Sequence, residues 1–148
     1  MFDTIALLDE LLPKDQPRYL MGVGRPTDLI KAIQLGVDMF DCVLPTRNAR
    51  NGQLFTSNGI INIENSKYKN SFDSLDENCN CYTCLNFSRS YLRHLFNIKE
   101  VLGLRLATIH NLTYYNNLMA TVRKKIKSEE FNNWSQSYLN SMADHENM

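Results

Sequence analysis

Three cysteines and one histidine constrain this chain more than any other feature. The thiols are spaced Cys79-x-Cys81-x-x-Cys84, and the histidine is His110. Three thiolates and one imidazole are soft or borderline ligands that complete a tetrahedral set for Zn²⁺. The cysteines lie in a polar, turn-prone segment, whereas the histidine lies in an apolar run, 101–112, that is typical of a helix. We therefore expect a tight knuckle and a helix to meet at one structural zinc ion per chain, with no position open for water.

The alternative for these cysteines is a set of buried free thiols or disulfides. Three thiols so close in sequence cannot all pair with one another, and no secretory signal indicates an oxidising compartment.

The length and charge of the chain limit its class. The chain has 148 residues, which is the length of one domain, and its formal net charge of zero predicts no polyanion partner. A basic run at 123–127 is either a solvated helix face or a phosphate-binding patch. No apolar stretch approaches the roughly 20 residues that span a bilayer, so we expect a cytoplasmic protein without membrane contact.

The first third of the chain has the pattern of a βαβ unit. A helical spacing over 2–12 ends at Pro13, and two short apolar runs, 18–24 and 37–44, flank a helical pattern at 26–35. Such a unit implies two parallel strands joined by a right-handed crossover. Because parallel sheets are wider than two strands and covered on both faces, we expect the end of a larger α/β fold.

The pattern changes after Pro45. Two short strands, 53–56 and 60–63, surround Ser57-Asn58-Gly59, and Asn-Gly between strands indicates a hairpin. The cysteine knuckle follows it. Helical patterns then cover three ranges, 87–96, 101–119 and 131–142.

Asp41 lies near the end of the second predicted strand, in an otherwise apolar run. A carboxylate there is costly unless it is paired or functional, and active sites form at the carboxyl ends of parallel strands. It is therefore either catalytic or an acid satisfied by a neighbouring arginine or by backbone amides. Arg47, Arg50 and Asn51 follow on a predicted loop. An acid beside two arginines suits a phosphodiester-linked ribose, because the arginines hold phosphates while the acid meets the sugar.

Two long segments, Arg18–Asp28 and Phe40–Gly52, together with the cysteines and the histidine, resemble the bacterial tRNA-guanine transglycosylases, also called queuine tRNA-ribosyltransferases. The resemblance extends in the same order over nearly the whole chain. It implies an α/β fold, the C-terminal part of a (β/α)₈ TIM barrel with an inserted zinc-binding subdomain. The implied regions are 1–52, the last βα units of the barrel; 53–112, the hairpin and zinc subdomain; and 113–148, the C-terminal helices.

The resemblance also implies roles for particular residues. Asp41 matches the catalytic nucleophile, and Met21 and Gly22 match part of the base pocket. Cys79, Cys81, Cys84 and His110 match the zinc ligands. Two predicted loops match the RNA-binding segments, whose members are Gly22, Val23, Gly24, Arg25, Pro26, Thr27 and Asp28, then Thr46, Arg47, Asn48, Ala49 and Arg50.

The implied reaction exchanges guanine at the tRNA wobble position for 7-aminomethyl-7-deazaguanine, a step toward queuosine. The aspartate forms a covalent ribosyl intermediate, and the family forms homodimers through the zinc region. The family's general acid/base aspartate has no match here, and the family is more than twice this length. We therefore expect a C-terminal portion, inactive alone. The alternatives are an inactive zinc-stabilised RNA-binding or dimerisation module, and a relic that does not fold stably.

Overall fold

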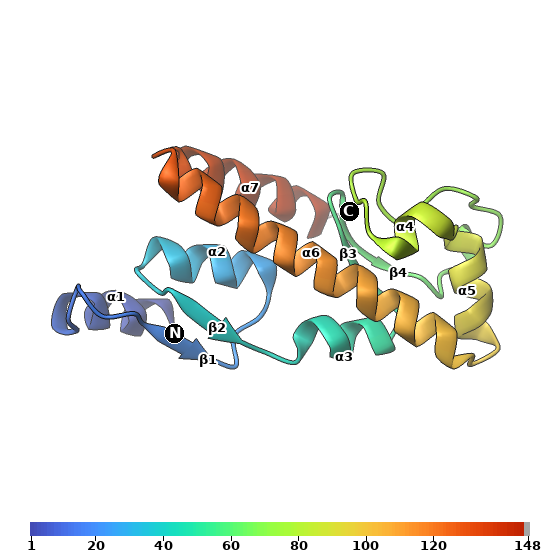
Figure 1. The fold of residues 1–148 in the computed structure, drawn as a ribbon, viewed down its shortest axis with the longest axis horizontal. Coiled ribbons are helices and arrows are strands. Elements are labelled where there is room, and N and C mark those ends of the chain that lie inside the picture. Colours follow the sequence, from blue (N-terminus) through green and yellow to red (C-terminus); the bar gives the residue numbers. More distant parts are fainter. Residues whose placement is uncertain (147–148) are drawn as a thin grey trace.

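Helix α6 (Val101–Lys127) runs along the molecule, and elements from both ends of the chain pack against it (Figure 1). The computed structural model describes residues 1–146, with side chains as far as 142; positions 147–148 of the predicted C-terminal region lie outside the described part. None of the described helices is both long and apolar enough to cross a membrane. The other elements are α1 (Phe2–Leu11), β1 (Tyr19–Met21), α2 (Pro26–Gln34), β2 (Met39–Asp41), α3 (Leu44–Arg50), β3 (Gln53–Thr56), β4 (Gly59–Asn62), the 3₁₀ helix η1 (Ser66–Tyr68), α4 (Tyr82–Asn86), α5 (Arg89–Asn97) and α7 (Phe131–Glu146).

The predicted βαβ unit is confirmed. Strands β1 and β2 are parallel, and their register pairs Tyr19 with Met39 and Met21 with Asp41. Both strands are shorter than the predicted runs. The ladder ends where the Gly22 amide donates to the Asp41 carbonyl at 3.0 Å, because the chain then leaves the sheet on both sides.

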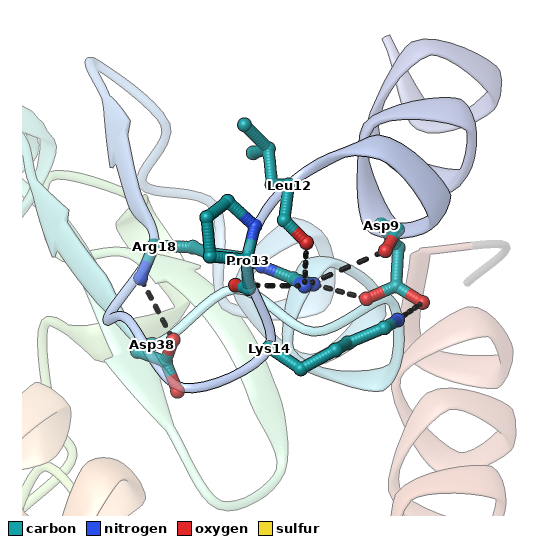
Figure 2. Close-up of polar contacts among 6 residues, drawn as sticks. All are labelled: Asp9, Leu12, Pro13, Lys14, Arg18 and Asp38. Carbon is teal, nitrogen blue, oxygen red and sulfur yellow. Dashed lines mark hydrogen bonds and ion pairs between the residues drawn. The ribbon is translucent and has the colours of Figure 1, made fainter.

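Arg18 joins the end of α1 to the start of β1 (Figure 2). Its guanidinium forms an ion pair with Asp9 and lies 3.4 Å from the carbonyl oxygens of Asp9, Leu12 and Pro13, which the end of the helix leaves without amide partners. Its own amide donates to the Asp38 carboxylate at 2.8 Å. This residue therefore links the end of α1 to the start of β1.

The segment after β2 is helical, and our expectation of a loop at 46–50 was wrong. Helix α3 begins at Leu44, so the second predicted strand also ends earlier than 44. Pro45 lies in the first turn of α3, where a fixed φ and a missing amide favour a helix. Ala49 is fully buried against the core around the cysteines, which holds the short helix in place.

The predicted hairpin is confirmed, with β3 and β4 antiparallel and Thr56 paired with Gly59 across the turn. The predicted helices after it are also present, and α6 continues eight residues beyond the predicted end at 119. The largest core cluster joins the hairpin, α5 and α6 around the cysteines; among its apolar members are Leu54, Ile63, Leu75, Leu92, Leu95 and Leu106.

One face of the β1–β2 sheet is open to solvent. Tyr19, Met21 and Met39 are 52%, 71% and 48% exposed on this face. The other side packs through Leu20 and Phe40 onto a small cluster of Ile5, Ala32 and Val37. The structure is thus a mixed α/β fold with a Cys₃His cluster, and the two strands do not by themselves form a barrel.

Candidate functional site

The four predicted metal ligands lie together in the core. Their donor atoms are all within 4.8 Å of one another, and all four residues are buried. From Nδ1 of His110, the Sγ atoms of Cys79, Cys81 and Cys84 lie at 3.8, 3.6 and 3.3 Å. Tetrahedral zinc with ordinary Zn–S and Zn–N bonds places such atoms about 3.6 Å apart. The donor set and its spacing therefore fit one metal ion of this kind.

A hydrogen bond at Nε2 of His110 determines that Nδ1 is the ring nitrogen available to a metal ion. Nε2 donates a 2.7 Å hydrogen bond to the carbonyl of Phe55 in β3, which leaves Nδ1 free to face the thiols. Metal-binding histidines ordinarily use their other nitrogen in this way, and the bond fixes both the tautomer and the ring. The histidine is fully buried on α6.

Hydrogen bonding and burial shift the pKa values of the three thiols in different directions. The hydrogen bond with Cys84, the largest effect, lowers the pKa of Cys81 to about 3, while the same bond raises the pKa of Cys84. Burial raises the pKa of Cys79. The opposite shifts describe one coupled pair rather than two independent acids, and the direction that follows is a thiolate centred on Cys81. Thiolates are the form that binds metal.

Two buried polar side chains tie the knuckle to its surroundings. The Asp76 carboxylate accepts bonds of 2.7 Å from the amide and from the hydroxyl of Ser57, and one of 2.9 Å from the amide of Asn78, so it joins the hairpin turn to the cysteine segment. Thr83 is fully buried and donates to the Leu106 carbonyl at 2.7 Å, which joins α4 to α6.

Asp41 is the last residue of β2, and its side chain is exposed. Its Oδ1 accepts a 2.8 Å bond from the hydroxyl of Tyr19 and a 3.3 Å bond from the amide of Gly22. Gly22 has a φ of +73°, a left-handed conformation that glycine adopts readily, and the same amide also donates to the Asp41 backbone carbonyl at 3.0 Å. The other carboxylate oxygen of Asp41, Oδ2, accepts no hydrogen bond from the residues whose side chains are described. One oxygen is therefore anchored and the other faces solvent.

The two arginines do not neutralise this carboxylate. Arg47 and Arg50 are exposed on α3, and the ion pairs among residues 1–142 involve Asp9 and Glu130 rather than Asp41. Of the two structural partners expected for a strand-end acid, a neighbouring arginine is thus absent from the described ion pairs, whereas a backbone amide, that of Gly22, is present. Tyr19 and a backbone amide hold the acid instead.

Both predicted RNA-binding segments border one hollow of about 520 Å³. Gly22–Arg25 is a loop, and residues 26–28 begin α2. Arg25, Pro26 and Thr27 line one side of the hollow, and Asn48 of α3 lines another. Phe55 and Tyr114 supply aromatic surface. The fold therefore brings together segments that are about twenty residues apart in the chain.

Two other residues considered from the sequence, Met21 and Cys42, lie outside the metal cluster. Met21 is highly exposed on the same sheet face as Asp41. Cys42 is half-buried outside the metal cluster, and a Cβ on Gly24 would lie 2.1 Å from its Sγ, so these residues pack tightly together. The sequence reasoning missed Tyr19, Asn111 and Tyr115. For Tyr19 a signal existed, since parallel pairing places it two residues from Met21 on one face.

These features define an α/β chain that joins a Cys₃His metal centre to a strand-end carboxylate beside two arginine-bearing segments. The family model described as queuine tRNA-ribosyltransferase matches residues 1–144. The queuine tRNA-ribosyltransferase of Francisella tularensis subsp. tularensis (strain WY96-3418) is 56% identical over 142 residues, covering 94% of this chain and 39% of the relative. That of subsp. novicida (strain U112) is 56% identical over 140 residues, 93% of this chain and 38% of the relative. The chain therefore belongs to the queuine tRNA-ribosyltransferase family, transferases that act on tRNA, and spans about 39% of the length of these relatives.

Proposed function

We propose that this chain supplies the C-terminal part of a cytoplasmic tRNA-guanine transglycosylase, which replaces guanine at the wobble position with 7-aminomethyl-7-deazaguanine during queuosine synthesis. The observation that carries the proposal is the state of Asp41. It lies at the carboxyl end of a parallel strand, one oxygen is held by Tyr19 and Gly22, and the other is free. An anchored carboxylate with one free oxygen suits nucleophilic attack.

The proposed step is a double displacement at the ribose. Asp41 Oδ2 bonds to the anomeric carbon as the bond to guanine breaks, and the guanine leaves with the bonding electrons and takes up a proton. The incoming base loses a proton and attacks the same carbon, which releases the carboxylate. Two inversions give net retention, as in retaining glycosidases. The target nucleotide must first leave the base stack.

The residues around Asp41 supply recognition in this proposal. Met21, exposed on the same face, stacks on the base beside the Gly22 amide. Arg47 and Arg50 are exposed and unpaired with Asp41, so their charges are available to phosphates. The loop from Gly22 and the segment Thr46–Arg50 then hold the RNA on either side of the hollow that they share.

We further propose that the metal is one structural zinc ion and that the βαβ unit is part of a (β/α)₈ barrel. The first rests on three sulfur atoms and one nitrogen with tetrahedral spacing. The second rests on the open sheet face, since a parallel sheet normally has both faces covered. In this proposal the barrel end is 1–52, the zinc subdomain is 53–112 and the C-terminal helices are 113–148. Helix α6 crosses the boundary between the last two regions.

A homodimer through the zinc region is the proposed assembly. The ring of Phe87 stacks on that of Tyr91, with centroids 5.4 Å apart. The ring of Tyr82 contacts Phe87 edge-on, with centroids 5.7 Å apart. Tyr82 and Leu85 are 58% and 66% exposed beside this stack. Exposed aromatic surface of this kind is typical of interfaces. The same surface supports the second candidate function, an RNA-binding or dimerisation module without chemistry.

The test is a chimaera that joins the preceding segment of a Francisella tularensis relative to this chain. We expect it to exchange labelled guanine into tRNA and to form a tRNA adduct that survives denaturing electrophoresis. Asp41→Asn should abolish the adduct while tRNA still binds. An active chimaera whose adduct survives Asp41→Asn contradicts the assignment of the nucleophile. A folded chimaera that binds tRNA but never exchanges guanine favours the binding module.

A further inference from the structure

Helix α6 holds three segments of the chain through side chains on one stretch of six positions, 110–115. His110, Asn111 and Tyr115 are 0%, 0% and 8% exposed, and each is bonded to the backbone of another element. Side chains buried this deeply are ordinarily apolar unless their polar atoms are satisfied. The bonds that satisfy them reach β3, the first turn of α3 and the loop that begins at Gly22.

Asn111 uses both ends of its amide. Its Oδ1 accepts from the amide of Phe55 at 3.1 Å, and its Nδ2 donates to the carbonyls of Pro45 at 2.9 Å and Gln53 at 3.1 Å. Pro45 lies in the first turn of α3, directly before Thr46. One side chain therefore holds the start of the arginine-bearing helix against β3.

Tyr115 holds the other segment. Its hydroxyl donates a 2.6 Å hydrogen bond to the carbonyl of Gly24, in the loop that begins at Gly22. Its ring meets Phe55 edge-on at 5.2 Å, so the hydroxyl is aimed by a packed aromatic pair. The loop cannot move away from α6 without breaking this bond.

The metal ligand belongs to the same arrangement. His110 bonds the carbonyl of Phe55, and Asn111 bonds its amide, so two consecutive residues of α6 hold both peptide groups of one strand residue. Hydrogen bonds through His110, Phe55 and Asn111 therefore connect the metal cluster to the start of α3.

We propose that Asn111 and Tyr115 are positioning residues that hold the two RNA-facing segments on α6, so that the metal centre and the RNA surface form one rigid unit. The RNA part rests on the proposed function. Segments held in place before binding lose less conformational freedom when RNA binds, and such preorganisation raises affinity. Neither residue needs to touch RNA for this effect.

Tyr115→Phe is the cleanest test, because it removes one hydroxyl and keeps the ring. Tyr138→Phe is the matched control: it removes a half-buried hydroxyl on α7, which bonds Tyr114 at 2.9 Å and no RNA-facing segment. Amide hydrogen exchange by mass spectrometry would be followed over 22–25 and 44–50, together with bound metal and tRNA affinity. We expect Tyr115→Phe to retain its metal, to exchange faster over 22–25 and to bind tRNA about threefold to tenfold more weakly, the effect of one lost hydrogen bond.

Asn111→Asp is the second variant. A carboxylate keeps the acceptor for Phe55 and loses both donors, so exchange should rise over 44–50 instead. Unchanged exchange over 22–25 in Tyr115→Phe, or equal loosening in Tyr138→Phe, overturns the proposal. The proposal also fails under a second combination of results. In that case Tyr115→Phe exchanges faster over 22–25 but binds tRNA as tightly as the parent, although Arg47→Ala does weaken tRNA binding. If Arg47→Ala and Arg50→Ala both leave affinity unchanged, the proposed RNA surface fails, and hydrogen exchange alone decides whether α6 holds these segments.

Discussion

Tyr19 donates a 2.8 Å hydrogen bond across the sheet to Oδ1 of Asp41. The two residues lie on neighbouring parallel strands, two register positions apart. Asp41 in turn raises the pKa of Tyr19, because a phenolate beside a carboxylate loses the hydrogen bond and meets a like charge. The tyrosine therefore remains a donor at every pH at which the carboxylate is ionised and ordinary tyrosines are neutral.

Tyr19→Phe should slow covalent adduct formation in the chimaera by about fivefold to tenfold, the effect of one hydrogen bond, with little change in tRNA affinity. The pKa can be measured directly from ¹³C-labelled tyrosine. The folded-state pKa is raised, so this bond's contribution to stability is full below about pH 10, the ordinary tyrosine value, and is lost as pH rises through the raised pKa. Asp41→Asn should lower the pKa of Tyr19; an unchanged value would mean that the bond does not form in solution.

Cys81→Ser should release the metal and unfold the region around the knuckle, since metal-binding energy at such sites is part of the folding energy. Elemental analysis should give one zinc per parent chain. Cys42→Ser is the matched control because Cys42 lies outside the cluster, and it should retain a full equivalent. Zinc should also dissociate as pH falls, since protons compete for the thiolates. A parent chain without stoichiometric metal contradicts the assignment.

Arg47→Ala should weaken tRNA binding and reduce the slope of log affinity against log salt by about one unit. The reason is the loss of one phosphate contact from an exposed side chain on α3. Arg105→Ala is the control, an exposed arginine on α6 that belongs to neither RNA-facing segment. Equal slopes for the parent and Arg47→Ala count against phosphate contact.

Asp9→Asn should loosen α1 from β1. The pKa of Asp9 is lowered by its hydrogen bonds from Lys14 and then from Arg18, so the ion pairs stabilise the fold above the ordinary carboxyl pKa of about 3.9 and are lost as pH falls through the lowered value. Hydrogen exchange in α1 should therefore rise at acid pH in the parent and should already be raised at pH 7 in Asp9→Asn. Asp3→Asn, on the same helix and outside these ion pairs, should behave as the parent.

Local patterns were sufficient for the metal cluster and the βαβ unit. Cys79, Cys81 and Cys84 are close in sequence, and a regular helix needs only to deliver His110, so spacing alone indicates their meeting. The helical state of Thr46–Arg50 was missed because the apolar run before it was read as strand, although Pro45 in a first turn and Gly52 beyond the end are helix signals.

The contacts of Asn111 and Tyr115 could not be predicted in this way. They join residues 66 and 91 positions apart and depend on how α6 crosses α3 and the loop after β1. Periodicity indicates which face of a helix is buried, but it does not indicate which distant carbonyl a buried amide or hydroxyl meets. The partner of Asp41 is a different case, since parallel pairing of the two predicted strands places Tyr19 on the same sheet face.

The two-stranded sheet has a further consequence for how the chain meets other polypeptides. Within the described residues β1 and β2 pair only with each other, so each presents one row of backbone amides and carbonyls along its outer edge. Unpaired rows of this kind are templates for strand addition. At high concentration the chain should therefore associate edge to edge, and a polypeptide that supplies the neighbouring strands should suppress that association by occupying the same edges.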